Sequence, residues 1–207
     1  MSVAVCDTPA GEYKFLGHIH YADGTLWGRR RGDQLPFDPG VLVDDDGRVW
    51  LYSGFYNAVP AILTGGHKLR CDGGTVLELE KDMVTIKTEP RVIFPKKGPG
   101  AFQGHEFFEA SSIRKEGKTY IFVYSSRHNH ELCYATSQSP DRGFSYGGTL
   151  VSQGDIFLDS NLSEKHAANY LGNTHGGLLK LEDKWYVFYH RQTNRHSYSR
   201  QACAEKL

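Results

Sequence analysis

Residues 104–126 read Gly-His-Glu-Phe-Phe-Glu-Ala-Ser-Ser-Ile-Arg-Lys-Glu-Gly-Lys-Thr-Tyr-Ile-Phe-Val-Tyr-Ser-Ser, and this stretch decides the fold. A polar turn at Lys115–Lys118 precedes the apolar run Tyr120–Tyr124, which is typical of a β-hairpin. Glu109 follows two aromatic residues just before the hairpin. A carboxyl group partly removed from water has a raised pKa, as a general acid working near neutral pH requires. A solvated glutamate at a strand end is the alternative interpretation of this stretch.

Similar hairpins occur earlier and later in the chain, at Val43–Tyr52 and Lys180–Tyr189. The residues that open the three hairpins are Asp38, Glu109 and His175. They stand about 70 residues apart, which is the length of four short strands, or one blade of a β-propeller. Because the innermost strands of successive blades line a central channel, we expect these three side chains to converge on one site.

Composition agrees with an all-β fold. Of the 207 residues, 23 are glycine and 13% are aromatic, and many short β-type runs are separated by turns. Lys plus Arg and Asp plus Glu both number 24, so the formal charge is zero, which argues against nucleic acid as a partner. No apolar run approaches the ~20 residues of a membrane span. The N-terminal residues lack a signal peptide, so a cytoplasmic location is expected if Met1 is the natural start.

The pattern of strand-forming residues predicts short strands along the whole chain. The predicted strands are Ser2–Cys6, Val41–Val43, Val49–Ser53, Thr75–Leu79, Arg91–Phe94, Tyr120–Tyr124, Glu131–Ser137, Gly148–Ser152, Leu178–Leu181, Trp185–His190 and Ser199–Glu205. Residues 17–36 are polar and rich in glycine, and we expect them to form a connection.

The four cysteines are widely spaced and include no C-x-x-C pair. Their spacing argues against a zinc site or a thiol redox motif and favours buried free thiols in a reducing compartment. The pairs His18-Ile-His20 and His128-Asn-His130 are interpreted as strand or loop histidines. Asp44-Asp-Asp-Gly47 is interpreted as a turn, since it lacks the spacing of a calcium loop. Asn161-Leu-Ser163 fits a weak glycosylation acceptor.

These residues resemble glycoside hydrolase family 43, the five-bladed β-propeller arabinofuranosidases and xylosidases. The resemblance covers nearly the whole chain. It is carried by Phe37-Asp-Pro-Gly-Val-Leu-Val-Asp-Asp-Asp-Gly47, Phe108-Glu-Ala-Ser-Ser112, Asn173-Thr-His-Gly-Gly177, Trp185-Tyr-Val-Phe-Tyr-His-Arg191 and Val3–Tyr13.

The resemblance implies a role for each conspicuous side chain. Glu109 would be the general acid, and Asp38 would orient it and tune its pKa. His175 would lie on the channel axis near a bound Ca²⁺ or water. The resemblance also implies that Arg191 reaches the substrate, and we expect the aromatic neighbours of the two acids, Phe37 and Phe108, to bind substrate as well.

The chain departs from the family pattern at the general base, an aspartate of the first blade, because no counterpart lies upstream of Asp38. We therefore expect an incomplete propeller of about three blades, as in a fragment of a longer gene product. It would lack blade one, most of blade two and the last strand of blade five. The expected parts are 1–16 for the end of blade two, 37–100 for blade three, 101–160 for blade four and 170–207 for blade five. Open blade edges favour self-association.

The predicted function is inverting exo-cleavage of α-L-arabinofuranosyl or β-D-xylosyl linkages in plant cell-wall glycans, on arabinose- or xylose-containing oligosaccharides. A propeller that binds carbohydrate without hydrolysing it, or an inactive fragment, is the alternative favoured by the missing base. A protein-interaction propeller is a third interpretation, supported only by the versatility of the fold.

Overall fold

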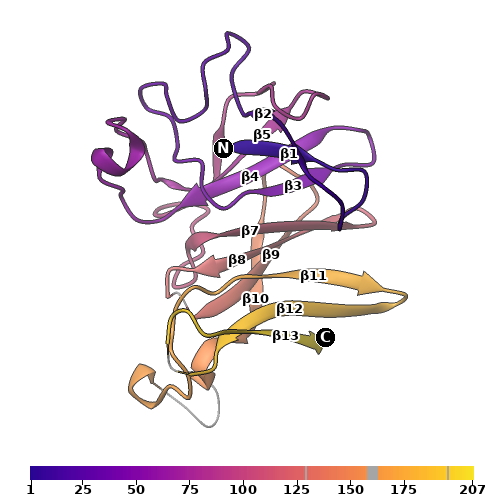
Figure 1. Ribbon diagram of the computed structural model, residues 1–207. Helices are drawn as coiled ribbons and strands as arrows, with labels where there is room; N and C mark the ends of the chain where they lie inside the picture. The colour runs from indigo at the N-terminus through magenta and orange to yellow at the C-terminus, as the bar shows by residue number, and fades with distance from the viewer. Residues whose placement is uncertain (129, 158–162, 195) are drawn as a thin grey trace.

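The computed structural model describes residues 1–128, 130–157, 163–194 and 196–207 (Figure 1). Within these ranges almost all regular structure is β-strand, arranged in four antiparallel sheets. The predicted all-β fold is therefore confirmed. None of the described helices is long and apolar enough to cross a membrane. Asn161, the predicted glycosylation acceptor, lies outside the described residues.

The first sheet has two strands, β1 (Ser2–Val5) and β2 (Lys14–His18), which pair antiparallel. The predicted strands include β1 but not β2. The reason is that Phe15 and Leu16 are adjacent and both largely exposed, at 65% and 46%, so the strand lacks the alternation that marks a half-buried strand. The predicted connection therefore begins only after His18.

This connection is more than a surface loop. Its residues Ile19, Tyr21 and Trp27 are buried in one apolar cluster with side chains of the second sheet. The Tyr21 hydroxyl donates to Asp33 over 2.7 Å, and the buried Asp33 carboxylate also accepts the backbone N–H of Gly28 over 2.7 Å. The connection thus covers one face of the second sheet and closes its core.

The second sheet has four strands in sequential order. They are β3 (Gly40–Val43), β4 (Val49–Phe55), β5 (Gly73–Leu79) and β6 (Arg91–Pro95). A short 3-10 helix, Ala61–Thr64, lies between β4 and β5. The acidic run after β3 forms the predicted turn, and its buried Asp44 accepts hydrogen bonds from Lys115 and from the Tyr120 hydroxyl of the next sheet.

The third sheet has the same sequential order. Its strands are β7 (Phe107–Glu116), β8 (Thr119–Ser126), β9 (Glu131–Ser137) and β10 (Ser145–Ser152). The main core lies between this sheet and the second one. Phe94 of β6 is 1% exposed and stacks on Phe122 of β8, with ring centroids 4.3 Å apart. Burial of each such side chain contributes about 1.5–3 kcal/mol.

The fourth sheet has three strands. They are β11 (Gly176–Leu181), β12 (Lys184–Gln192) and β13 (Arg200–Lys206). Two short 3-10 helices, Gln153–Asp155 and Glu164–His166, precede it. In Figure 1 the sheets follow one another from β1 to β13, with the termini at opposite ends of the stack.

The first strands of the last three sheets lie side by side. Strand β7 contacts both β3 and β11. The approach is so close at Gly40 that an added Cβ would lie 2.6 Å from the backbone oxygen of Ser111. Residues at the start of β3, β7 and β11 therefore meet, as they do in adjacent propeller blades. The sheets fall inside the predicted blade ranges except that β2 extends to His18, and the blade boundaries themselves stay a prediction.

Candidate functional site

Glu109 lies on β7 at a β-bulge. The register between β7 and β8 shifts on both sides of Glu109, and the next residue, Ala110, has a left-handed φ of 67°. A bulge re-aims the side chain beside it and is common next to active sites. Glu109 is only 7% exposed. Local backbone geometry therefore turns a strand carboxylate toward the neighbouring sheets.

Asp38 stands just before β3 and has a φ of 47°, a conformation that aspartate tolerates better than most residues. The residue before it is tied down from both sides. The backbone N–H of Phe37 donates to Ser53 Oγ, and this hydroxyl donates to the Phe37 carbonyl, each over 2.7 Å. The strained backbone at Asp38 is thus held in place by β4.

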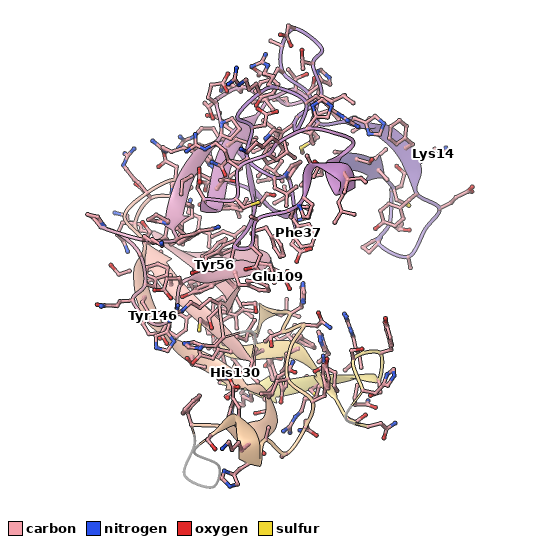
Figure 2. All side chains as sticks on the ribbon, turned by 90° about the vertical axis from the view of Figure 1, so that its left-hand side faces the viewer. Lys14, Phe37, Tyr56, Glu109, His130 and Tyr146 are labelled. Carbon is pink, nitrogen blue, oxygen red and sulfur yellow. The ribbon has the colours of Figure 1, made fainter. Side chains whose placement is uncertain are left out.

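His175 stands just before β11 and completes the site. Its Nε2 atom lies 2.8 Å from Oδ2 of Asp38, although the two residues are 137 positions apart. One ligand atom from each of Asp38, Glu109 and His175 lies within 4.8 Å of the other two. Three sheets therefore supply one triad, which is the convergence that the sequence predicts. Figure 2 places Phe37 and Glu109 on the inner side of the curved stack of sheets.

The surroundings of the triad shift two pKa values upward. Burial is the main cause of the raised pKa of Glu109, and the charge of Asp38 adds to it, whereas His175 and Arg200 oppose it. The hydrogen bond to Asp38 is the main cause of the raised pKa of His175. Glu109 is therefore inclined to hold a proton while His175 and Asp38 form a charge-assisted pair.

The spacing restricts what the two carboxyl groups can do together. Inverting glycosidases keep acid and base about 6.5–9.5 Å apart, so that a water molecule fits between them. The nearest oxygens of Asp38 and Glu109 lie within 4.8 Å. Asp38 is too close to serve as that base. It is suited instead to raising the pKa of Glu109.

Two residues that the sequence analysis missed lie beside the triad. The His190 ring on β12 stacks on that of His175, with centroids 6.1 Å apart. Burial and then the charge of Arg200 lower the pKa of His190. Arg200 of β13 lies opposite Gln192 of β12 and thus shares the His190 face. The quoted family motif contains His190, but no motif marks Arg200.

Arg191, the arginine expected to reach the substrate, is placed differently. It follows His190 on β12, so alternation directs its side chain to the opposite face of the sheet. Its Nη2 atom lies 3.3 Å from Asp155 Oδ1. Arg200, rather than Arg191, is the arginine whose charge acts on Glu109.

The two predicted aromatic residues belong to one cluster. The Phe37 ring lies 4.7 Å from Phe55, and the Phe55 ring lies 5.2 Å from Phe108. Phe108 also borders an open cavity of about 470 Å³, which Tyr56, Asn57, Arg127 and His128 complete. Aromatic faces beside a polar cavity suit a sugar ring, whose C–H groups pack on aromatic surface.

The triad offers few ligands for the Ca²⁺ expected near His175. Calcium prefers six to eight oxygen ligands. The described donors are one imidazole and two carboxylates, and of these Asp38 is already bonded to His175. The donor set therefore suits Ca²⁺ only as an ion that takes most of its ligands from water.

Comparison with known proteins places the chain in a family. The sequence profile described as glycosyl hydrolases family 43 matches residues 1–207. The chain belongs to this family. A "Xylosidase/arabinosidase" from Thermoclostridium stercorarium is 49% identical to this family 43 chain in an alignment of 211 positions, which covers 100% of the chain and 42% of that protein. A "Xylosidase/arabinosidase" from Bacteroides ovatus is 30% identical, over 92% of the chain and 55% of that protein.

Solved structures confirm the family 43 propeller fold. A family 43 enzyme from Xanthomonas citri, complexed with xylose, superposes with a TM-score of 0.69 at 23% identity, over 100% of this chain and 60% of that one. A β-xylosidase/α-arabinofuranosidase from a compost microbial metagenome, in complex with xylotriose and in a calcium-free form, superposes with a TM-score of 0.69 at 24% identity. The match covers 100% of this chain and 61% of that one. The family 43 chain thus spans about half the length of its curated relatives and about 60% of these structures.

Proposed function

We propose that this chain carries the acid side of a glycosidase active site that cleaves β-D-xylosyl or α-L-arabinofuranosyl linkages with inversion. The observation that supports it most is the convergence of Asp38, Glu109 and His175 from three sheets, with a buried Glu109 whose pKa is raised. Family membership and the names of the relatives, xylosidases and arabinosidases, supply the substrate class.

In this mechanism Glu109 is protonated and donates its proton to the glycosidic oxygen as the bond to the sugar breaks. Asp38 keeps the proton on Glu109 through its negative charge, and His175 holds Asp38 in place through the 2.8 Å bond. A separate base would activate water on the opposite face of the sugar. Within the triad we assign no base, because Asp38 is too close to Glu109 for that task.

Substrate contacts are part of the same proposal. Phe37 and Phe108 would pack against sugar rings through the aromatic cluster at the cavity. We transfer the substrate-binding role expected of Arg191 to Arg200, since Arg191 pairs with Asp155 on the other face of β12. The ligands would be oligosaccharides that contain xylose or arabinose.

The test replaces Glu109 in the longest natural protein that contains this chain. Glu109→Gln should slow the release of xylose from xylobiose at least about 10²-fold, because the leaving group of xylobiose needs a proton. The same variant should retain most activity on an aryl xyloside whose leaving group needs no proton. Equal activity of wild type and Glu109→Gln on xylobiose would remove Glu109 from the role of acid.

A carbohydrate-binding propeller without hydrolysis is the second candidate. The observation that favours it is the short distance between the two carboxylates, which leaves the triad without an inverting pair. Calorimetry with xylotriose and arabinose-containing oligosaccharides, followed by chromatography of the mixture, separates the candidates. Binding heat with unchanged oligosaccharide supports a binding module, whereas released pentose supports the enzyme.

Calcium and self-association complete the proposal. Ca²⁺ would bind near His175 as a largely hydrated ion, and a rise in melting temperature after Ca²⁺ is added to chelator-treated protein would support this. Self-association would use the first sheet, where Val5, Phe15 and Leu16 are 50%, 65% and 46% exposed. Sedimentation of wild type and Phe15→Ser at several concentrations measures it.

A further inference from the structure

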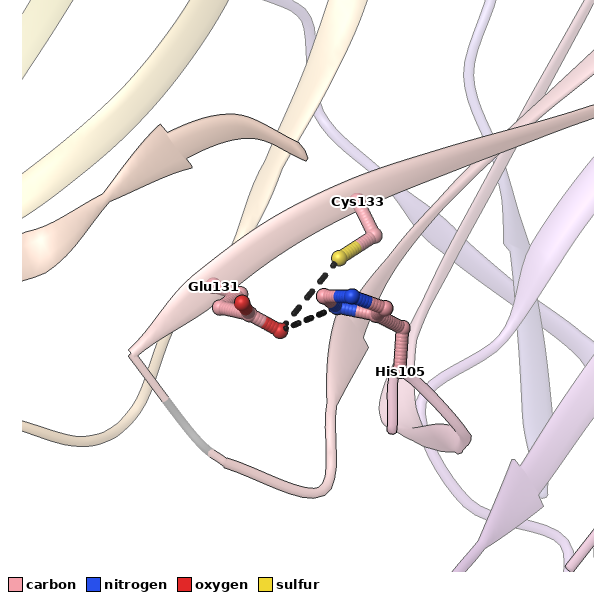
Figure 3. Close-up of side chains that lie close together, drawn as sticks. All are labelled: His105, Glu131 and Cys133. Atoms are coloured by element: carbon pink, nitrogen blue, oxygen red, sulfur yellow. Dashed lines mark hydrogen bonds and ion pairs between the residues drawn. The ribbon is translucent and has the colours of Figure 1, made fainter. Parts of the chain in front are cut away.

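A second cluster of metal-ligating side chains uses none of the triad residues. His105, Glu131 and Cys133 each offer a ligand atom, and these atoms lie within 4.8 Å of one another (Figure 3). His105 Nδ1 lies 2.9 Å from Glu131 Oε2, and the Cys133 thiol donates to the same oxygen over 3.8 Å. A nitrogen, an oxygen and a sulfur therefore converge on one point.

The fold holds each of these side chains in place. Glu131 and Cys133 are two residues apart on β9, so both face the same side of the strand. The His105 carbonyl in the loop before β7 accepts a hydrogen bond from the Tyr124 hydroxyl over 2.7 Å. The His105 ring also stacks on Tyr146 with centroids 4.5 Å apart and planes 11° apart. The cluster is thus organised before any ligand arrives.

Burial makes the cluster suitable for a cation. Cys133 is fully buried and Glu131 is 8% exposed, while a third of the His105 side chain is open to solvent. Ser126 Oγ donates a hydrogen bond to Glu131 Oε2 over 2.7 Å, which helps to hold the orientation of the carboxylate. Burial opposes the charged form, but the hydrogen bonds from Ser126 and His105 lower the pKa of Glu131, so this buried carboxyl group favours the charged form that a cation binds. An approaching cation would enter from the His105 side.

We propose that His105, Glu131 and Cys133 form a site for a zinc-class divalent cation. Imidazole nitrogen and thiolate sulfur are ligands that Zn²⁺ accepts and that Ca²⁺ and Mg²⁺ avoid. Three protein ligands leave the fourth tetrahedral position to water, supplied through the exposed edge of His105. The sequence argued against a zinc site because it has no C-x-x-C pair. That argument concerns ligands close together in sequence, whereas this site is assembled from a loop and a strand.

Binding rearranges two protons and changes no oxidation state. The S–H bond of Cys133 breaks, its proton passes to solvent, and the thiolate donates an electron pair to the metal. The proton that His105 Nδ1 shares with Glu131 moves to Nε2 on the solvent side, so that Nδ1 donates its lone pair. The cation would link β9 to the loop before β7, and this loop is close in sequence to Glu109.

Cobalt titration of the full chain, freed of metal with a chelator and dialysed, tests the site. A Co²⁺–thiolate bond produces a charge-transfer absorption band in the near ultraviolet. The Asp38, Glu109 and His175 triad contains no sulfur, so ions bound there give no such band. We expect the band to saturate at one equivalent and to disappear when Zn²⁺ displaces Co²⁺.

Variants decide whether this cluster is responsible. Cys133→Ala should abolish the band, and His105→Gln should weaken Co²⁺ binding by at least about tenfold. Cys71→Ala, which removes another buried free thiol, should leave the band unchanged. The proposal is overturned if folded wild type gives no band, if the band survives Cys133→Ala, or if Cys71→Ala removes it.

If Cys133→Ala does not fold, the variant His105→Gln still tests the proposal. His105 lies in a loop and is partly exposed, so its replacement disturbs the core little. Unchanged Co²⁺ affinity in that variant, with circular dichroism like that of wild type, also overturns the proposal. The readout is optical and requires no glycosidase activity, so the outcome is independent of the proposed function.

Discussion

Replacing Asp38 with asparagine isolates the charge that acts on Glu109. Asp38→Asn keeps the shape of the side chain and an oxygen that accepts a hydrogen bond from His175. The Asp38 charge is the second cause, after burial, of the raised pKa of Glu109, and the two carboxylates approach within 4.8 Å. At an effective dielectric constant of about 20, unit charges at this separation interact by about 3.5 kcal/mol.

The net effect of Asp38 is smaller than the bare interaction of the two charges, because His175 lies 2.8 Å from Asp38 and its imidazolium cancels much of the carboxylate field. We therefore expect Asp38→Asn to lower the pKa of Glu109. Burial is unchanged by the substitution, so the pKa should still lie above the ordinary value of 4.5 for this carboxyl group.

The assay is carbon-13 NMR of protein labelled at the glutamate side-chain carboxyl, titrated from acid to neutral pH. Glu109→Gln identifies the Glu109 signal by its absence. Asp183→Asn, in the exposed turn between β11 and β12, removes the same net charge away from the triad and should leave the Glu109 titration unchanged. A Glu109 pKa that is the same or higher in Asp38→Asn would refute the electrostatic reasoning.

Three further predictions concern stability. Because its bond to Asp38 raises the pKa of His175 above 6.5, that bond stabilises the fold most below about pH 6.5 and less as the pH rises through the folded-state pKa. The stability advantage of wild type over Asp38→Asn in urea should therefore shrink between about pH 6 and pH 9; a growing advantage contradicts the sign. Phe94→Ala, at the centre of the aromatic core, should cost about 3–5 kcal/mol in urea unfolding, and a loss below ~1 kcal/mol would show that the core repacks. Gly40→Ala should cost about 1–3 kcal/mol, since the new Cβ would lie 2.6 Å from the Ser111 oxygen, and thermal unfolding at the wild-type temperature would show that β3 and β7 separate easily.

The strands and the triad were largely predictable from the sequence. Alternating apolar residues around short polar turns predict most strands, because one face of each strand must be buried. The similar spacing of Asp38, Glu109 and His175, about 70 residues, predicts their convergence, because blades repeat around an axis. Strand β2 was missed because Phe15 and Leu16 are exposed, and exposed strands leave no hydrophobic pattern. The first half of β7 was missed as well, since Glu109 was expected before the hairpin and lies inside the strand, where the bulge interrupts the alternation.

Features that depend on tertiary packing could not be predicted. Only the two buried cysteines, Cys71 and Cys133, match the expectation of buried free thiols, since Cys6 and Cys203 are half-buried. Alternation on β12 was available in the sequence and would have separated His190 from Arg191. The partners of Cys133 come from a loop and a strand, and such a pairing has no fixed sequence spacing.

Arg200 connects the edge of the fourth sheet with Glu109, because the charge of this arginine acts on the pKa of Glu109. It is the first residue of β13, which pairs with β12 on one side only, and strand ends at a sheet edge open locally at lower free energy than the core. Each opening would carry the guanidinium away from Glu109 and remove a charge that lowers the pKa of that carboxyl. The protonation of Glu109 would then follow the fraying of the last strand, so hydrogen exchange at the Arg200 amide and acid strength at Glu109 should vary together.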